Sequence, residues 1–570
     1  MRKRILVVGG VTGGASTAAR CRRLDADAEI IVFEQGAHVS YSNCCLPYHL
    51  SGTVKDSRSL ILMTPERFQK QYDIEVRVKN RVTAIHPDEK TITVCDLTNH
   101  QTYTEAYDTL VLSTGASPIL PESIAGIHGP QVFSIRNVTD IQQLKQYIDE
   151  HQIKKAAVIG GGFIGIETAE NLTLAGISVS LIEGSNQILG QFDYDMVQTL
   201  HKEMMDHGVS LHLSSVLSEI REHSIVLRNQ NSQALLELEA DLVVMAIGIR
   251  PETTLAIEAG LQIGETGGIL VNHNYQTSDS NIYAVGDAIE SFHRLLHKPG
   301  RLALAGPAQR QARDAADHIY GKEATNTGFI GSSCLRVFEQ NAASTGLNEK
   351  TATEAGIPYQ FAYLLPSDKV SLMPDSHYMQ FKLLFEVPTG RILGAQAIGK
   401  GSTDKRIDVI ATLISMGGTL EHLKNLELCY SPVFGTAKDI VNVAALVGLN
   451  LLNQSYRQVP VSLVRSLVEN NACIIDVREE AEYKNGHLLT AKNIPLSQLR
   501  ERMEEIPRDI PVYLHCRTSQ RSYYAISCLQ GHGYKNLWNI SGSFLGISLY
   551  EYFNDKTEGR TPIVTAYNFK

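Results

Sequence analysis

No apolar run in the sequence approaches the length of about 20 residues that a bilayer-spanning helix needs. Cationic side chains are not in excess either, because 52 lysines and arginines face 61 aspartates and glutamates and leave a net charge of −9 at pH 7. The first absence predicts a protein without a membrane span. The second argues against nucleic acid as the main partner, since no surplus of cations is present to neutralise phosphates.

Signals for secretion are missing as well. Only the apolar stretch 5–8 separates the basic start of the chain from Gly9, which is too short for a signal peptide. The nine cysteines are odd in number and scattered, unlike the disulfide framework of a small secreted protein. We therefore expect a cytoplasmic protein with reduced thiols, and 570 residues are enough chain for several domains.

Two segments share one pattern: an apolar strand, a glycine-rich turn, a helix of small residues, and a second strand that ends in an acid. The first segment spans residues 5–34 and the second spans residues 157–183. Glycines in such a turn let the backbone approach a pyrophosphate, and the phosphates then lie at the positive N-terminus of the helix. The repeated pattern predicts two dinucleotide-binding sites in one chain.

The second of these sites matches the dinucleotide fingerprint closely. Gly160, Gly162 and Gly165 are followed 18 residues later by Glu183 at the end of a strand. A carboxylate at this position can accept a hydrogen bond from a ribose 2′-hydroxyl and would repel a 2′-phosphate. This favours NADH over NADPH.

The first site departs from the fingerprint, because Val11 stands between Gly9 and Gly14 where a glycine is usual. The acid, Glu34, still follows Gly14 by 20 residues. Later in the chain, residues 281–288 read as a strand that delivers Asp287 to a glycine turn and a helix. Together these features indicate FAD in the first site and NADH in the second.

With these motifs the sequence resembles the pyridine nucleotide-disulfide reductase superfamily. In that family an aspartate like Asp287 forms a hydrogen bond with the ribityl chain of the flavin. The resemblance also implies further cofactor-binding positions at Val82, Gly115 and Gly248.

The segment 40–48 contains the adjacent cysteines Cys44 and Cys45. Two-cysteine flavin reductases have Cys-x4-Cys here, but His49 stands where the partner of Cys44 would be. The pattern Ser-x-x-Asn-Cys-x-Leu-Pro-Tyr instead resembles the single-cysteine branch, which holds coenzyme A-disulfide reductases, persulfide reductases, NADH oxidases and NADH peroxidases. The resemblance implies that Cys44 cycles between a thiolate and a mixed disulfide or sulfenic acid. Cys45 is either a bystander or a resolving thiol.

Cations on the first helix suggest where a substrate binds. Ser16, Arg20 and Arg23 recur at i, i+4 and i+7 and so share one face, which is either a solvated surface or an anion site suited to the phosphates of coenzyme A. Coenzyme A-disulfide reductases bind their substrate at matching positions. The resemblance therefore implies substrate binding by Ser16, Arg20, Arg23, Ser40, Asn43 and Lys438, with Phe68 and Lys70 on the same pocket wall.

Residues 428–439 resemble the family's Tyr-x-Pro-Pro-Tyr stretch, which reaches the active site of a partner subunit and so implies a homodimer. Tyr430 is kept and is expected to donate a proton or hydrogen bond to a departing thiolate. Phe434 replaces the second tyrosine, and Leu372 and Met373 stand where relatives have a tyrosine pair. The missing phenols favour a substrate with a better leaving group, such as a persulfide or polysulfide.

The last hundred residues contain the loop Cys516-Arg-Thr-Ser-Gln-Arg-Ser522, which follows a strand and opens a helix. This loop and its flanking motifs resemble rhodanese. The helix N-terminus, Arg517 and Arg521 would lower the pKa of the Cys516 thiol and hold a persulfide anion. Rhodaneses often have glycine where Ser519 stands.

The predicted fold class is α/β, with two Rossmann-like dinucleotide-binding domains, an α+β interface domain and a C-terminal α/β rhodanese domain. The expected ranges are 1–118 and 249–325 for the FAD-binding domain, 119–248 for the NAD-binding domain, 326–453 for the dimerisation or interface domain, and 459–565 for the rhodanese domain.

The predicted function is FAD- and NADH-dependent reduction of coenzyme A persulfide, polysulfide or coenzyme A disulfide through Cys44, coupled to sulfur transfer at Cys516. Coenzyme A is thus a substrate or bound ligand, and no metal site is predicted. Two alternatives stay open. One is an NADH oxidase or peroxidase that uses Cys44 sulfenic acid, and the other is a sulfur carrier or redox sensor whose flavin half is only a scaffold.

Overall fold

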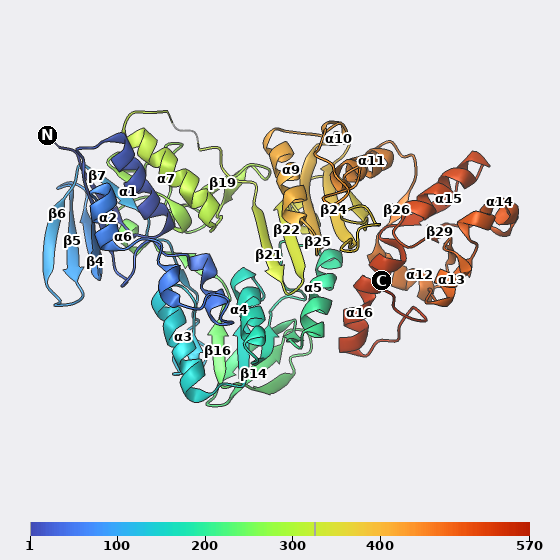
Figure 1. The fold of residues 1–570 in the computed structure, drawn as a ribbon, viewed down its shortest axis with the longest axis horizontal. Helices are drawn as coiled ribbons and strands as arrows, with labels where there is room; N and C mark the ends of the chain where they lie inside the picture. Colours follow the sequence, from blue (N-terminus) through green and yellow to red (C-terminus); the bar gives the residue numbers. More distant parts are fainter. Residues whose placement is uncertain (1, 324–325, 570) are drawn as a thin grey trace. The chain divides into compact units, whose positions relative to one another are not determined.

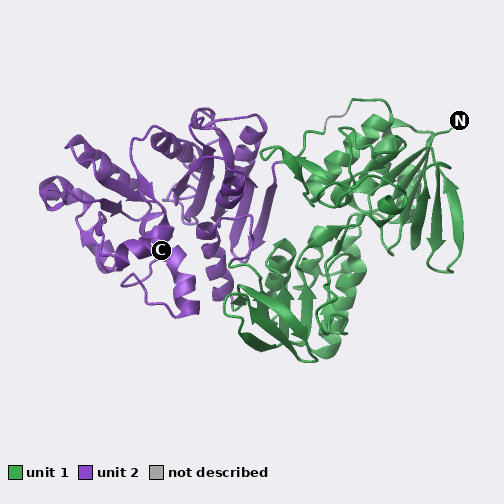
Figure 2. Cartoon of the chain, turned by 180° about the vertical axis from the view of Figure 1, so that it is seen from behind, with its two compact units in different colours: residues 1–186, 208–329 green, residues 187–207, 330–570 purple. Residues whose placement is uncertain are grey.

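The computed structural model describes residues 2–323 and 326–569, with the elements labelled in Figure 1. The chain forms two compact units (Figure 2). Unit 1 comprises Met1–Asn186 and Gly208–Phe329, and unit 2 comprises Gln187–His207 and Ile330–Lys570. The chain therefore enters unit 2 briefly at residue 187, returns to unit 1, and enters unit 2 again at residue 330.

The first parallel sheet of unit 1 has the strand order β18-β7-β1-β2-β3. Ile5, Leu6 and Val7 of β1 are completely buried, as expected for a strand covered on both faces. Helices α1 and α7 pack against each other beside this sheet. The bounds are β1 (Arg4–Val8), β2 (Glu29–Glu34), β3 (Glu75–Val78), β7 (Thr109–Leu112), β18 (Ile282–Ala284), α1 (Thr12–Leu24), α2 (Pro65–Tyr72) and α7 (Ala305–Ile319).

The second parallel sheet of unit 1 has the order β12-β11-β10-β16-β9. Antiparallel sheets, β4-β5-β6 and β13-β14-β15, complete the two halves of the unit. The bounds are β4 (Asn80–His86), β5 (Thr91–Asp96), β6 (Thr102–Ala106), β9 (Val132–Phe133), β10 (Lys155–Ile159), β11 (Ser178–Ile182), β12 (Ser210–His212), β13 (Ser215–Ile220), β14 (Ser224–Asn229), β15 (Leu235–Glu239), β16 (Leu242–Met245), α3 (Val138–His151), α4 (Phe163–Leu174) and α6 (Thr254–Glu258).

The chain passes between these two halves at an antiparallel strand pair. β8 (Ala116–Pro118) leads out of the first half and pairs with β17 (Ile249–Pro251), which leads back into it. The strand β18 then delivers Asp287 to a turn at Gly286, but the expected helix is only a single 3-10 turn, Gly286–Ala288. The short hairpin of β19 (Ser291–His293) and β20 (Lys298–Gly300) and then α7 follow it.

Unit 2 begins with an antiparallel sheet in the order β21-β22-β25-β24-β23. Helix α9 packs on β22 and β25, and α11 packs on β23 and β24. The bounds are β21 (Ser332–Val337), β22 (Gln340–Gly346), β23 (Tyr359–Leu364), β24 (Met379–Glu386), β25 (Ile392–Gly399), α8 (Glu349–Glu354), α9 (Thr403–Ser415), α10 (Leu420–Lys424) and α11 (Ile440–Leu452).

The C-terminal part of unit 2 is built on a parallel sheet in the order β26-β30-β29-β27-β28. Its core includes Ile474, Ile540 and Phe544. The bounds are β26 (Gln458–Val459), β27 (Cys473–Asp476), β28 (Lys492–Asn493), β29 (Val512–His515), β30 (Leu537–Ile540), α12 (Val464–Glu469), α13 (Glu480–Lys484), α14 (Leu499–Arg502), α15 (Gln520–Gly531) and α16 (Ser543–Glu558).

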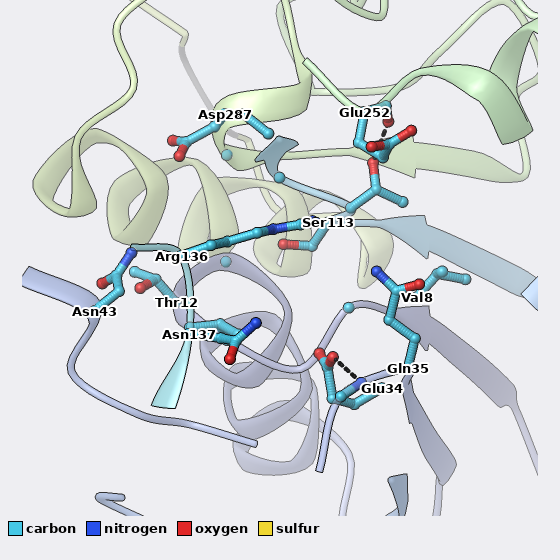
Figure 3. A pocket seen from close by; sticks show the side chains of 18 of the residues that line it. Val8, Thr12, Glu34, Gln35, Asn43, Ser113, Arg136, Asn137, Glu252 and Asp287 are labelled. Atoms are coloured by element: carbon cyan, nitrogen blue, oxygen red, sulfur yellow. Dashed lines mark hydrogen bonds between the residues drawn. The ribbon is translucent and has the colours of Figure 1, made fainter. Parts of the chain in front are cut away.

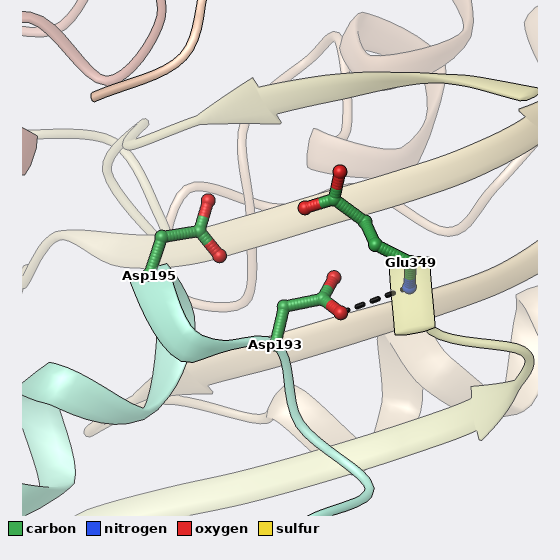
Figure 4. A group of neighbouring side chains, drawn as sticks. All are labelled: Asp193, Asp195 and Glu349. Carbon is green, nitrogen blue, oxygen red and sulfur yellow. Dashed lines mark hydrogen bonds between the residues drawn. The ribbon is translucent and has the colours of Figure 1, made fainter. Parts of the chain in front are cut away.

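Helix α5 (Tyr194–Asp206) belongs to unit 2 and is held there by a buried ion cluster. Asp193, Asp195 and Glu349 offer carboxylate oxygens within 4.8 Å of one another (Figure 4). The ammonium of Lys382 lies 3.1 Å from Asp193 and 2.9 Å from Asp195, and it also pairs with Glu349. Lys382 therefore supplies the positive charge that these carboxylates need, and α5 packs in addition on α16.

Within the described ranges, no helix combines the length and the apolar character that crossing a bilayer requires. The architecture agrees with the predicted fold class, since two parallel α/β sheets precede an antiparallel-sheet domain and a C-terminal parallel α/β domain.

Candidate active site

A cavity of about 860 Å³ opens in unit 1 at the end of strand β1 (Figure 3). It is bounded by the turn before α1, by the segment that contains Cys44, and by the turn that contains Asp287. The structure thus brings together residues that the sequence predicted from widely separated motifs. Those on the cavity wall are Gly9, Val11, Glu34, Asn43, Cys44, Val82, Gly115 and Asp287.

The glycines at the starts of α1 and α4 are needed for close packing of helix on strand. A Cβ atom on Gly14 would overlap the carbonyl oxygen of Gly9, and one on Gly165 would overlap the carbonyl oxygen of Gly160. Gly9 and Gly160 also have positive φ angles of 96° and 112°, which side-chain-bearing residues rarely adopt. The two turns are therefore built alike, although Val11 replaces a glycine in the first.

The two predicted ribose acids occupy equivalent positions. Glu34 accepts a hydrogen bond from the backbone N–H of Gly10 at 2.9 Å, and Glu183 accepts one from the backbone N–H of Gly161 at 2.7 Å. Each carboxylate is thereby held at the glycine turn where a dinucleotide would place its ribose. Gly162 caps α4, and Gly248, with φ of 124°, lies just after β16.

Asp287 provides the test of whether FAD fits this cavity. Burial raises the pKa of its carboxyl group, and among the described residues the structure shows no hydrogen bond to it. A partly buried carboxyl group on a cavity wall is stabilised by a ligand that supplies a hydrogen-bond donor. A hydroxyl-bearing chain such as the flavin ribityl would supply one, so the residues present fit FAD.

Several residues on the cavity wall were missed by sequence reasoning. Arg136 and Asn137 lie between β9 and α3, and Asn137 caps α3. Ser113 directly follows β7, and Glu252 directly follows β17. The N-cap of Asn137 is a recognisable signal for a helix start, but nothing in the spacing links it to the glycine turn more than a hundred residues earlier.

Cys44 is exposed on the wall of this cavity within the 3-10 turn Asn43–Cys45. Although the residue is exposed, the surrounding protein partly desolvates its thiol and so raises the pKa, and the charges of Glu167, Cys45 and Asp287 raise it further. Cys45 is only half-exposed and is not on the cavity wall. The ring of His49, at the position of the missing second cysteine, lies 2.7 Å from the carbonyl oxygen of Val54.

The predicted substrate cations are used in different ways. Arg20 forms an ion pair with Asp317 of α7, and both side chains are 15% exposed. The side chains of Arg23, Lys70 and Lys438 are exposed, and that of Ser16 is half-buried. Ser40 adopts a positive φ of 47°. Phe68 is 3% exposed and packs in the core of unit 1, and its place on the substrate-pocket wall stays a prediction. Binding of coenzyme A by the other positions stays a prediction.

Two loops of unit 2 contain the residues that replace the family tyrosines. Tyr430 is 51% exposed, Phe434 is 69% exposed and Leu372 is 85% exposed. Both loops are fixed by the buried Arg406, whose guanidinium donates to the carbonyl oxygens of Asp368 and Phe434 at 3.0 and 3.3 Å. Arg406 lies inside helix α9, and no motif in the sequence singled it out.

Cys516 directly follows β29 in the C-terminal domain and is 1% exposed. Its backbone N–H donates to the hydroxyl of Ser543 at 3.1 Å, and the Ser522 hydroxyl lies 3.6 Å from its sulfur atom. Ser519, where rhodaneses often have glycine, adopts a left-handed φ of 74°, a conformation that favours glycine. Its hydroxyl donates a hydrogen bond to the carbonyl oxygen of Ile540. The predicted loop-to-helix geometry at Cys516 is thus present.

The two arginines of this loop have protein partners. Arg521 forms paired hydrogen bonds with Glu482 at 2.6 and 2.7 Å. Arg517 donates to the carbonyl oxygen of Asn568 at 3.0 Å, and its guanidinium lies 5.9 Å from the ring of Tyr378. Burial lowers the pKa of Arg517. An anionic substrate would therefore compete with these partners for both cations.

Comparison with known families agrees with this arrangement. Residues 3–312 match the family described as pyridine nucleotide-disulphide oxidoreductase, and residues 334–439 match the dimerisation domain of the same family. Residues 461–549 match the rhodanese-like domain.

Individual relatives match over most of their length. A coenzyme A disulfide reductase of Staphylococcus haemolyticus is 31% identical over 444 residues, which cover 78% of this chain and 98% of that protein. The crystal structure of reduced Bacillus anthracis CoADR-RHD is 40% identical with a TM-score of 0.92, covering 98% of this chain and 99% of that one. A NAD-dependent persulfide reductase from A. fulgidus is 33% identical with a TM-score of 0.90, covering 95% of this chain and 99% of that one.

Proposed function

Because the chain belongs to the pyridine nucleotide-disulphide oxidoreductase family and ends in a rhodanese-like domain, we propose that it uses NADH to reduce a coenzyme A persulfide, polysulfide or coenzyme A disulfide through Cys44. Cys516 exchanges sulfane sulfur with the same substrates. The observation that carries this proposal is the place of Cys44, which lies on the wall of the cavity that fits FAD and has His49 where a second redox cysteine would be.

The residues at the two glycine turns and around the cavity indicate the cofactors. Asp287 and Glu34 would hold hydroxyl groups of FAD in the cavity, and Glu183 with the turn at Gly160 would hold NADH. When bound, FAD supplies the means to pass two electrons from NADH to sulfur. Asn43, which shares the 3-10 turn with Cys44, and Arg136 line the same cavity and position the reactants.

Cys44 reduces the substrate in two steps, cleavage of the substrate S–S bond and reduction of the disulfide that Cys44 then forms. The thiolate bonds to one sulfur of the substrate S–S bond, and the electron pair of that bond leaves on the other sulfur as a thiolate or hydrosulfide. Two electrons originating from NADH then break the new disulfide and restore the Cys44 thiolate. One NADH and one proton are consumed for each S–S bond that is cleaved, and NAD⁺ and two thiol-level products are formed.

A persulfide or polysulfide is the preferred substrate class. Leu372, Met373 and Phe434 supply no phenolic proton donor where relatives have tyrosines, so a substrate whose leaving group needs less protonation is favoured. Tyr430 remains as one donor, supplied by a second copy of the chain in a homodimer. The match of residues 334–439 to a dimerisation domain and the exposure of Tyr430 and Phe434 support this assembly.

Replacing Glu183 by glutamine is expected to raise kcat/KM for NADPH on the order of tenfold, because a like charge no longer faces the 2′-phosphate. The kcat/KM for NADH should fall modestly, since the amide oxygen still accepts a hydrogen bond. Steady-state rates with both nucleotides measure the change. Glu239→Gln, at an exposed carboxylate of the same domain that pairs with Lys155, should leave the NADPH-to-NADH ratio unchanged. An unaltered ratio in Glu183→Gln would exclude Glu183 as the discriminating group.

The function is tested by anaerobic NADH oxidation with coenzyme A persulfide, coenzyme A disulfide, glutathione persulfide, polysulfide, elemental sulfur and peroxide as acceptors. Reduction of a sulfur acceptor with little peroxide turnover supports the proposal. Fast turnover of peroxide or oxygen alone would instead favour an oxidase, and a water-forming NADH oxidase from Lactobacillus brevis is 28% identical with a TM-score of 0.75.

Cys516→Ser is expected to abolish transfer of sulfane sulfur from thiosulfate to cyanide or to a thiol, because the nucleophile for that step is gone. Reduction of coenzyme A disulfide, which needs only Cys44, should stay within about twofold of wild type. Cys473→Ser, in the same domain but outside the loop, is the matched control. Loss of disulfide reduction in Cys516→Ser would mean that the two cysteines form one reaction sequence for every substrate.

A further inference from the structure

His515 directly precedes Cys516 at the end of β29 and has no part in the reaction as described so far. It is completely buried, as is Asp476, its direct neighbour on the adjacent strand β27. The ring nitrogen Nδ1 lies 3.3 Å from the carbonyl oxygen of Cys516, and the other nitrogen, Nε2, lies 3.7 Å from Oδ2 of Asp476. Each nitrogen of this imidazole therefore faces an oxygen atom that accepts hydrogen bonds.

A neutral imidazole cannot satisfy both oxygen atoms, because it has one N–H group and one lone pair. In either tautomer, one ring nitrogen presents its lone pair to an acceptor. Among the described residues, Nε2 of His515 indeed has no hydrogen-bond partner, although the atom is buried. An unpartnered buried polar atom is costly, and a second proton on the ring would turn both contacts into favourable ones. The surroundings of His515 therefore accommodate an imidazolium.

Groups of both charges surround the ring. They are Asp476 at the end of β27, Arg478 two residues later, Cys516 itself and His487 after α13. The buried guanidinium of Arg478 donates to Asp476 at 2.6–3.1 Å, so these two charges largely offset each other. Burial lowers the pKa of His515 and the charge of Asp476 opposes this shift, whereas Arg478 and His487 add to it. His515 is therefore neutral near pH 7 until negative charge develops beside it.

The oxygen atom that faces Nδ1 also fixes the sulfur loop. The carbonyl oxygen of Cys516 accepts a hydrogen bond from the backbone N–H of Phe544 at 3.0 Å, and the N–H of Cys516 donates to the hydroxyl of Ser543 at 3.1 Å. The ring of Phe544 stacks on that of His515, with 6.2 Å between their centroids. His515 and the start of α16 therefore hold the backbone of Cys516 from both of its polar groups.

We propose that His515 is a positioning residue of the sulfur loop that gains a proton when Cys516 becomes negatively charged. The proposal rests on the proposed function, in which Cys516 exchanges sulfane sulfur. As Cys516 bonds to the outer sulfur of a donor, the donor S–S bond breaks and its electron pair leaves on the departing fragment. The thiol loses its proton and His515 gains one, so the buried site holds a persulfide anion and an imidazolium at unchanged net charge. When an acceptor thiolate takes the outer sulfur, Cys516 regains a proton and His515 returns to its neutral form.

The test is single-turnover loading of Cys516 from thiosulfate, measured by mass spectrometry as the gain of one sulfur atom. In wild type the proton stays within the site, so the loading rate should vary by no more than about twofold between pH 6 and pH 8. The amide of His515→Asn can still donate to the Cys516 carbonyl but takes up no proton, so its thiolate forms only by losing a proton to solvent. The variant should load on the order of 100-fold more slowly at pH 6, and its rate should rise about tenfold per pH unit.

His532→Asn is the matched control, because it makes the same change at an exposed histidine of the same domain. Its loading rate should depend on pH as little as that of wild type. A second measurement follows alkylation of the Cys516 peptide by iodoacetamide over the same pH range, which depends on the thiolate and needs no sulfur donor. The same contrast between wild type and His515→Asn is expected there.

A wild-type loading rate that rises about tenfold per pH unit would overturn the proposal without any variant, since His515 would then hold no proton. The same pH dependence in wild type and His515→Asn, whatever their absolute rates, would also contradict it, because the role of His515 would then be structural. If wild type gains no sulfur at all, the proposed exchange at Cys516 fails. The alkylation profiles then decide separately whether His515 takes up the proton.

Discussion

Cys44→Ser is expected to lower kcat for NADH-dependent reduction of any persulfide or disulfide on the order of 10³-fold or more, because a serine hydroxyl is not ionised near neutral pH and does not attack sulfur. The substitution replaces the polarisable sulfur atom with an oxygen atom. It leaves the glycine turns, Glu34 and Asp287 unchanged. NADH should therefore still bleach the flavin absorbance under anaerobic conditions. Stopped-flow absorbance separates this half-reaction from turnover with the acceptor.

Cys45→Ser is the matched control, since it makes the same change one residue further along on a side chain that is not on the cavity wall. Its kcat should stay within about threefold of wild type. If Cys44→Ser kept full activity, the single-thiol route would be wrong. If Cys45→Ser were as damaged as Cys44→Ser, Cys45 would be a resolving thiol.

Lys382→Met is expected to lower the free energy of unfolding of unit 2 by about 3–5 kcal/mol, the cost of leaving buried carboxylates without their counter-ion. Lys382 is 1% exposed and is the cation shared by Asp193, Asp195 and Glu349. Urea denaturation followed by the fluorescence of Trp538, the single tryptophan of the chain, measures the change within unit 2.

The destabilisation should grow as the pH rises. Burial already raises the pKa of Asp195 and of Glu349, and the charge of Lys382 opposes that shift. Without the lysine, the folded-state pKa values rise further, so the folded protein binds more protons than the unfolded chain and loses stability as these protons leave.

Lys400→Met removes a lysine that is more exposed and pairs with a single carboxylate, Glu339, so it should cost no more than about 1 kcal/mol. Equal stability of wild type and Lys382→Met at pH 8 would contradict an ionised cluster.

The glycine turns could be predicted because their requirements are local. Gly14 and Gly165 are needed wherever a helix begins directly after a buried strand, since the overlap that a side chain would cause involves an atom only five residues away. The same holds for Glu34 and Glu183, each of which closes its own βαβ unit. His49 shows by residue type alone that Cys44 has no Cys-x4-Cys partner.

Other members of the site could not be predicted, because their positions depend on how separate elements pack. Arg136 reaches the cavity from the connection before α3, more than a hundred residues after the glycine turn that it faces across the cavity. The burial of Phe68 in the core of unit 1 is likewise decided by packing and not by a local pattern.

Residue types and short spacings by themselves predicted the two dinucleotide turns and the strand-to-helix loop at Cys516, because steric limits act over a few bonds. Tertiary structure alone decided that α5 leaves the second dinucleotide domain for unit 2, that Arg406 fixes two distant loops, and that Tyr378 covers Arg517. Such contacts join residues far apart in the chain through burial and hydrogen bonding, which no local pattern records.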